Sequence, residues 1–178
     1  MASSLFIDGE LHAPHFIFLR CGGRYSDTDL LCRFGLPTYR PTKAAPRIGP
    51  YAVLADDGQW TMIADDWYYT LWHMPSTRPT LAALGESVDV FACSVGDCDR
   101  SFDFVYYRAS YLIRKYVVAD PDFRGGVVVE NLGRPLPGEW AAFEQAGELR
   151  IVLGIAASLG IKTDYTEQDI RVYAPPGR

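Results

Sequence analysis

Alternating apolar and polar positions mark much of this chain as β-strand. The clearest stretch is residues 88–130, where runs rich in Val, Tyr and Phe are separated by short polar turns. β-branched and aromatic residues between turn residues are typical of the strands of an antiparallel meander. Within 102–108 and 111–117 both alternating sets contain apolar side chains, so we expect both faces of the sheet to be partly covered.

Further strands are predicted on both sides of this meander. An Asp57-Gly58 pair lies between the apolar runs 51–55 and 60–64, and this combination is a strong signal of a β-hairpin. Short apolar runs predict additional strands at residues 5–10, 15–20 and 170–173.

Helices are predicted where the apolar spacing changes to a period near 3.6. We expect one that is capped by Asp65 and Asp66 and runs through Trp67, Leu71 and Met74. Others are expected at 79–84, 139–145 and 148–159. The last carries an apolar stripe suited to docking on a sheet, formed by Leu149, Val152, Leu153 and Ala156.

These elements predict an α+β fold in which residues 1–178 form a single domain. We expect a mostly antiparallel, twisted sheet of about six or seven strands, with helices on one face and the C-terminal helix docked across it. No linker-like composition marks a boundary near Ser87. Residues 38–50 contain three prolines and three basic residues and are predicted to form a long surface loop.

Charge and cysteine content narrow the classes of function. The chain has 178 residues, a formal net charge of −5 and a pI of about 5.1, which argues against nucleic acid as a partner. No apolar run is long enough for a membrane span, and no secretory signal is recognisable at the N-terminus. We therefore expect a cytoplasmic protein whose four cysteines are reduced.

No motif in the chain points to a catalytic residue, a metal or a cofactor. Residues 96–101 place Asp97 and Asp99 two apart, as calcium loops do, but Phe102 and Arg108 stand where such a loop needs Gly and Glu. Nucleophile elbows, redox Cys pairs and phosphate-binding glycine loops are missing from the sequence. The paired aspartates occur where turns and helix starts favour Asp.

The most distinctive local group is aromatic, and it has two interpretations. Five rings gather within thirteen residues, Trp60, Trp67, Tyr68, Tyr69 and Trp72, and they can anchor a core or form a patch for a protein partner. Our leading hypothesis is a non-enzymatic module that binds a protein with a basic surface. The residues assigned to that surface are Asp65, Asp66, Trp67 and Trp72.

The alternative is a small-molecule-binding protein or small enzyme with an aromatic pocket between sheet and helices. Its lining would be Tyr106, Tyr107, Arg114 and Tyr116. The chain is expected to be a monomer or a homodimer. In general character, acidic, α+β and without a catalytic motif, it is similar to bacterial immunity proteins, which block toxin domains. This similarity rests on no matched motif, so it implies no site residue.

Overall fold

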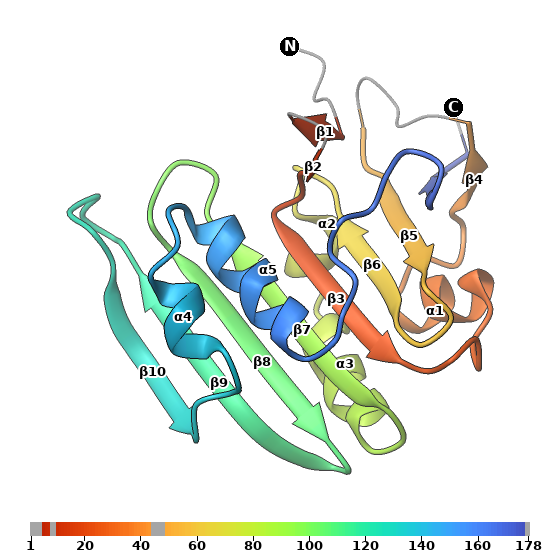
Figure 1. Cartoon of the computed structure of the whole chain (residues 1–178). Coiled ribbons are helices and arrows are strands. Elements are labelled where there is room, and N and C mark those ends of the chain that lie inside the picture. Colours follow the sequence, from red (N-terminus) through yellow and green to blue (C-terminus); the bar gives the residue numbers. More distant parts are fainter. Residues whose placement is uncertain (1–4, 8–9, 44–48, 177–178) are drawn as a thin grey trace.

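The computed structural model describes residues 5–7, 10–43 and 49–176. Its centre is one nine-stranded sheet in which every pairing between described strands is antiparallel. From one edge to the other the strands are β10 (Val127–Gly133), β9 (Tyr111–Ala119), β8 (Phe102–Arg108), β7 (Asp89–Val95), β3 (His15–Arg20), β6 (Thr61–Asp65), β5 (Ala52–Asp56), β11 (Ile170–Ala174) and β4 (Arg40–Thr42) (Figure 1). A separate two-stranded ladder joins β1 (Phe6–Ile7) to β2 (Glu10–Leu11).

The predicted α+β class is confirmed, and the sheet holds the chain together as one domain. Strand β3 pairs with β6 on one side and with β7 on the other, so strands that precede and follow Ser87 in the chain belong to the same sheet. The sheet is larger than the six or seven strands that we predicted. One added strand, β4, lies in the stretch predicted as a loop, and its Pro41 is tolerated because β4 is an edge strand. Residues 44–48 of that stretch lie outside the described residues.

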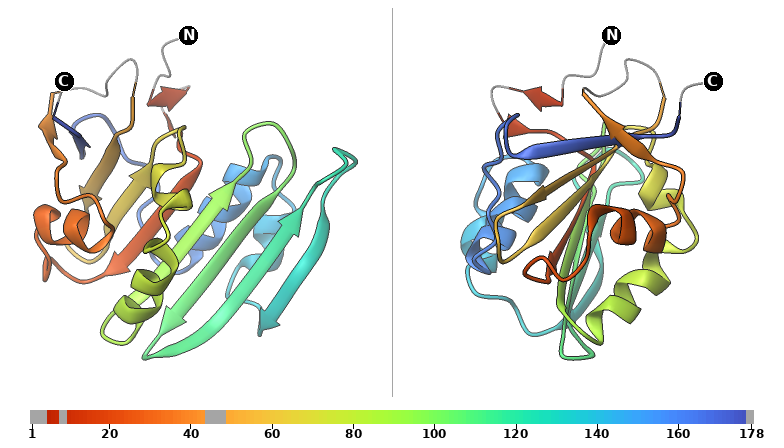
Figure 2. Two further views of the ribbon diagram at one scale, coloured as in Figure 1. Left: turned by 180° about the vertical axis from the view of Figure 1, so that it is seen from behind. Right: turned by 90° about the vertical axis from the view of Figure 1, so that its right-hand side faces the viewer.

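Helices cover both faces of the sheet rather than the single face that we predicted (Figure 2, right). On one face lie α4 (Glu139–Phe143) and α5 (Glu148–Ser158); on the other lie α1 (Asp27–Arg33), α2 (Thr70–His73) and α3 (Thr77–Gly85). The physical reason is that both side-chain sets of the central strands are apolar. Phe104 and Tyr106 belong to the core beneath α5, whereas Val105 and Tyr107 pack with the core beneath α1 and α3.

The cover on the α1–α3 side stops short of one edge of the sheet. Helix α3 packs against β7 and β8, and the two strands beyond it, β9 and β10, have no described helix over them on this side (Figure 2, left). We call this uncovered part of β8, β9 and β10, on the α3 side, the open face. Among the described residues no helix is long and apolar enough to cross a membrane.

Candidate functional site

The two carboxylates predicted to border a partner-binding patch lie inside the protein. Asp65 is 1% exposed and Asp66 is 0% exposed. Asp66 accepts hydrogen bonds from the backbone N–H groups of Tyr51 and Tyr68 at 2.7 and 2.8 Å, and Asp65 accepts one from that of Trp72 at 2.9 Å. Both side chains therefore shape the chain between β6 and α2, and neither presents its charge at the surface.

These same hydrogen bonds make α2 much shorter than predicted. Asp65 still belongs to β6, and Tyr69 has a left-handed backbone with φ of 54°, so the helix begins only at Thr70. Trp67 and Tyr68 therefore precede the helix and do not lie on a helical face with Trp72.

The two tryptophans of the predicted patch lie in different places. Trp67 stacks on His12, with ring centroids 4.8 Å apart and an interplanar angle of 21°. Trp72 approaches His15 edge-on, with centroids 5.3 Å apart and an angle of 70°. Of the four residues, Trp72 is the one that borders the open face.

Arg114, which we assigned to an aromatic pocket, is engaged in a closed ion pair. Its guanidinium is 1% exposed and donates to both carboxylate oxygens of Glu139, at 2.6 and 3.0 Å. It also donates to the Asn131 side chain and to the backbone oxygens of Leu132 and Gly133. This cluster anchors α4 to β9 and β10, so Arg114 has a structural role in this conformation.

The three tyrosines assigned to that pocket lie on opposite faces of the sheet. Tyr106 and Tyr116 face α4 and α5, where Tyr116 stacks on Phe104 with ring centroids 5.7 Å apart. The Arg114 guanidinium lies close to both of these stacked rings. Tyr107 lies on the α3 side, and it contributes to a hollow in the open face.

Two adjoining hollows occupy the open face beside Trp72. One has a volume of about 420 Å³ and the other about 370 Å³, and Trp72, Asp103 and Val117 line both. We call the two together the Trp72 groove. Its further polar lining includes side chains from β3, β7, α3, β9 and β10, namely His15, Ser94, Arg78, Lys115 and Glu130, and also Asp99 and Asp120. A volume of this size suits a small ligand or one large side chain.

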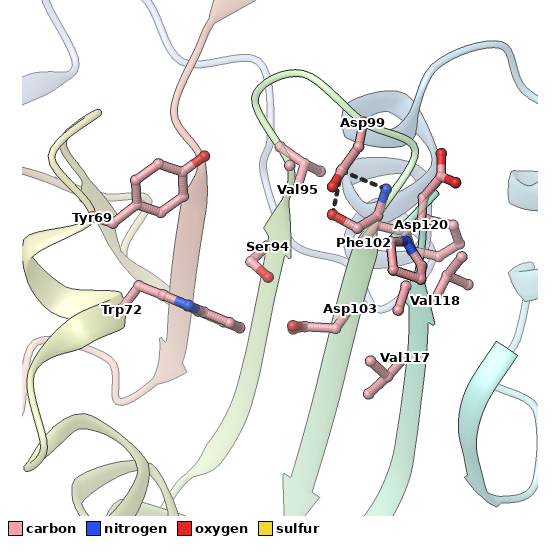
Figure 3. Close-up of a pocket in the computed structure, with 14 residues that line it drawn as sticks. Tyr69, Trp72, Ser94, Val95, Asp99, Phe102, Asp103, Val117, Val118 and Asp120 are labelled. Atoms are coloured by element: carbon pink, nitrogen blue, oxygen red, sulfur yellow. Dashed lines mark hydrogen bonds between the residues drawn. The ribbon is translucent and has the colours of Figure 1, made fainter. Parts of the chain in front are cut away.

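A row of polar side chains crosses the floor of the groove. His15 on β3 is paired with Ser94 on β7, and Ser94 is paired with Asp103 on β8. Directly paired residues of an antiparallel sheet project from the same face, so the three side chains form a line across three strands. Figure 3 shows the Ser94 and Asp103 side chains directed toward each other, with the Trp72 indole beside them.

Both ionisable groups of this row are perturbed by burial. Burial raises the pKa of Asp103 to about 6, against the lowering effects of the Ser94 hydroxyl and of the charges of Arg78 and Lys115. Burial lowers the pKa of His15 to about 4, so the imidazole is neutral at pH 7. Among the described residues neither His15 ring nitrogen has a hydrogen-bond partner. An interaction with the Cys93 backbone offsets part of the fall in the pKa of His15. Buried polar atoms without partners are rare in proteins and often mark a function.

The row does not form a hydrolase triad. In such a triad a carboxylate orients the imidazole, and the imidazole in turn meets the nucleophile. Here Ser94 stands between His15 and Asp103, and the unpartnered ring nitrogens show that no carboxylate orients His15. Across the described residues no three His, Cys, Asp or Glu side chains are placed to hold a metal ion. The arrangement is suited to binding a polar group.

Sequence reasoning singled out Trp72 and Tyr107 but missed the rest of the groove. A signal for two of these residues was present in the strand patterns. His15 precedes Ile17 and Leu19 at alternate positions, and Asp103 precedes Val105 and Tyr107 in the same way, so each is a polar residue on an otherwise apolar strand face. Their convergence depends on pairing of β3 with β7, which the sequence alone does not specify.

Comparisons with known proteins give no relative from which a function could be taken: no protein-family model, no curated protein and no solved structure matches the chain.

Proposed function

We propose that this protein is a non-enzymatic module that binds another protein through the open face and the β10 edge. The observation that carries the proposal is the exposed apolar surface of β9 and β10. Leu112 is 43% exposed, Val127 is 59% exposed and Leu132 is 50% exposed. Leu112 and Leu132 line the same hollow, and exposed apolar side chains that gather on a folded protein are typical of an interaction site.

The backbone of β10 adds a second source of affinity. It is the last strand of the sheet, and the sheet order gives it β9 as its one neighbour among the described strands. Seven residues long and without proline, it offers backbone donors and acceptors to an added strand. The edge carries two features that disfavour unspecific strand pairing, namely a bulge between Val128 and Glu130 and the 2.6 Å Lys115–Glu130 ion pair. Neither feature covers the strand.

The partner that we propose has a basic surface. The chain carries a net charge of −5, and opposite net charges accelerate association and favour the correct partner. A toxin domain that this protein neutralises, in the cytoplasm, would be such a partner. Trp72 would contribute an aromatic anchor at the border of the apolar surface.

Two matched variants test the proposal. Partners captured from the native cell by the wild-type protein are identified and purified, and their affinities for the Leu132→Lys and Trp140→Lys variants are titrated at several salt concentrations. Leu132 lies on β10 in the Trp72 groove, whereas Trp140 is 66% exposed on α4, on the other side of the sheet. A basic partner should lose at least about tenfold in affinity with Leu132→Lys, and its affinity should fall with salt.

Two outcomes contradict the proposal. One is equal loss of affinity in both variants, or loss only in Trp140→Lys, because the interface would then lie elsewhere. The other is a wild-type protein that light scattering shows to be a homodimer and that Leu132→Lys converts to a monomer, because a second copy would then occupy the β10 edge.

A further inference from the structure

The Trp72 groove has an excess of buried hydrogen-bond acceptors at its floor. Asp103 is mostly buried, and its pKa is raised because burial outweighs the favourable interactions with its neighbours. Ser94 is 8% exposed and His15 is 3% exposed, with both ring nitrogens unpartnered. A carboxylate, a hydroxyl and a neutral imidazole together offer several acceptors, and a ligand group rich in N–H donors would satisfy them.

The wall of the groove suits a flat cation. Trp72 is half-buried beside the acceptor row and borders both hollows, and an indole face attracts guanidinium and ammonium groups. Arg78 already places its guanidinium carbon 5.9 Å from the centre of the Trp72 ring. Its charge also acts on Asp103. Arg78, which is exposed, therefore already places a guanidinium beside the Trp72 ring, as we expect of a ligand in the groove.

The two basic side chains of the groove, Lys115 and Arg78, do not pair with the carboxylate at its floor. Lys115 is held by Glu130 at 2.6 Å, so most of its charge is balanced at the β9–β10 side. Arg78 lies on α3, and it acts on Asp103 through its charge rather than through a hydrogen bond.

We propose that the Trp72 groove binds a guanidinium group, namely an arginine side chain of the basic protein partner, through Asp103, Ser94, His15 and the face of Trp72. The planar fork of N–H donors of arginine matches a carboxylate and a neighbouring acceptor better than the point charge of lysine does. In the free protein Arg78 competes for the ring and for Asp103, and it moves aside when the partner's side chain enters. This inference rests on the proposed function, since it takes a basic protein as the source of the guanidinium.

The test needs no identified partner. N-acetyl-arginine amide, which mimics an arginine side chain within a protein, is titrated into the wild-type protein and followed by the NMR signals of the Trp72 indole and the Ser94 amide. N-acetyl-citrulline amide is the matched control, because it has nearly the same shape without the charge. Free arginine is the third probe, and it distinguishes a free amino acid from a protein side chain as the source of the group.

We expect saturable shifts at Trp72 and Ser94 with N-acetyl-arginine amide, and at least about tenfold weaker binding of N-acetyl-citrulline amide. Asp103→Asn should weaken binding of the arginine probe about tenfold, whereas Arg78→Ala should strengthen it because the competing cation is removed. The control variant Asp122→Asn, which changes an exposed carboxylate elsewhere, should bind like the wild type. Backbone NMR spectra of each variant show whether it is folded, and Arg78→Ala and Asp122→Asn alter exposed residues only.

Three results overturn the inference. They are equal binding of the arginine and citrulline probes, unchanged binding by folded Asp103→Asn, and binding of free arginine without binding of N-acetyl-arginine amide. If any of these is found while Leu132→Lys still abolishes binding of a purified partner, the guanidinium site falls and the proposed function stands. If the arginine probe binds as expected but Leu132→Lys has no effect on any partner, the guanidinium site stands and the proposed function falls.

Discussion

Asp65 accepts a hydrogen bond of 2.9 Å from the backbone N–H of Trp72, seven residues later in the chain. A buried carboxylate at the end of β6 thus fixes the start of α2, and with it the place of the indole beside the open face. Burial raises the pKa of Asp65 to about 7, which means that the folded protein destabilises the ionised form of this carboxylate. An acid that sequence reasoning placed on a binding surface acts instead behind that surface, by positioning the ring.

Asp65→Ala should therefore destabilise the protein and loosen Trp72. The backbone N–H groups of Asp66 and Trp72 lose their acceptor, and a buried N–H group without a partner costs about 1–3 kcal/mol. Urea unfolding measures the loss, and the NMR signal of the Trp72 indole should broaden. The exposed Glu86→Ala is the control, and it should change neither. An Asp65→Ala protein with wild-type stability and a sharp Trp72 signal would contradict this role.

The Asp103→Asn variant should show how the buried acid affects stability with pH. The pKa of Asp103 is raised from 3.8 to about 6, so the folded state holds this proton more tightly than the unfolded state does. Its stabilising contribution is complete below pH 3.8 and is lost as the pH rises through 6. Charged or titratable groups face it from β3, α3, β9 and β10, namely His15, Arg78, Lys115 and Glu130, besides the Ser94 hydroxyl on β7.

Between pH 5 and 7.5 the wild type should lose about 1–2 kcal/mol of unfolding free energy relative to Asp103→Asn. The comparison is made by urea unfolding of both proteins at a series of pH values. The other titrating groups are present in both, so the difference isolates Asp103. A difference that is constant with pH, or that grows in the opposite direction, would show that Asp103 does not titrate as described.

The Arg114–Glu139 pair should behave as a buried ion pair that is costly to break from one side. Arg114→Met leaves the fully buried Glu139 without its partner and should cost about 3–5 kcal/mol in urea unfolding. The double variant Arg114→Met/Glu139→Leu should recover part of that loss, although the Leu136 N–H then loses its acceptor. Arg134→Met, at an exposed arginine nearby, is the control and should have little effect. A double variant that loses the sum of the two single losses would contradict a mutual interaction.

Helix α5 should be held to the sheet by its fully buried side chains, which include Val152, Ala156 and Ile155. The Ile155 side chain is fully buried beneath the helix, whereas Leu153 is only partly buried. Ile155→Ala should cost about 2–5 kcal/mol through lost burial and the cavity left behind, and Leu153→Ala should cost less. Thermal or urea unfolding of the two variants decides this. If Leu153→Ala proves the more damaging, the helix is rotated relative to the structure described.

The strands could be predicted from the sequence more reliably than their surroundings. Alternation over 102–108 gave the correct assignment of Phe104 and Tyr106 to one face and of Val105 and Tyr107 to the other. Asp57-Gly58 correctly predicted the β5–β6 hairpin. These features depend on local chemistry, namely the two-residue period of a strand and the backbone preferences of turn residues.

Features that depend on distant pairing could not be predicted in this way. In the sequence, Asp65 and Asp66 resemble an exposed acidic pair. Only the fold shows that they are buried and accept hydrogen bonds from backbone N–H groups. In the sequence, Arg114 among aromatic residues resembles a ligand-binding cation. Only the packing of α4 against the sheet brings Glu139 to it. In both cases a charged side chain is matched by partners that are far away in sequence or belong to the backbone, and neither kind of partner leaves a sequence pattern.

The central claim, that a partner binds across the open face and the β10 edge, is tested most directly by hydrogen–deuterium exchange of the protein with and without its purified partner. The account predicts that binding slows exchange of the backbone N–H groups of β10, residues 127–133, and of the segment around Trp72. The β4 edge and the exposed side of α5 should exchange at unchanged rates. Protection confined to β4 and β11, or to α4 and α5, with β10 unchanged, would contradict the account.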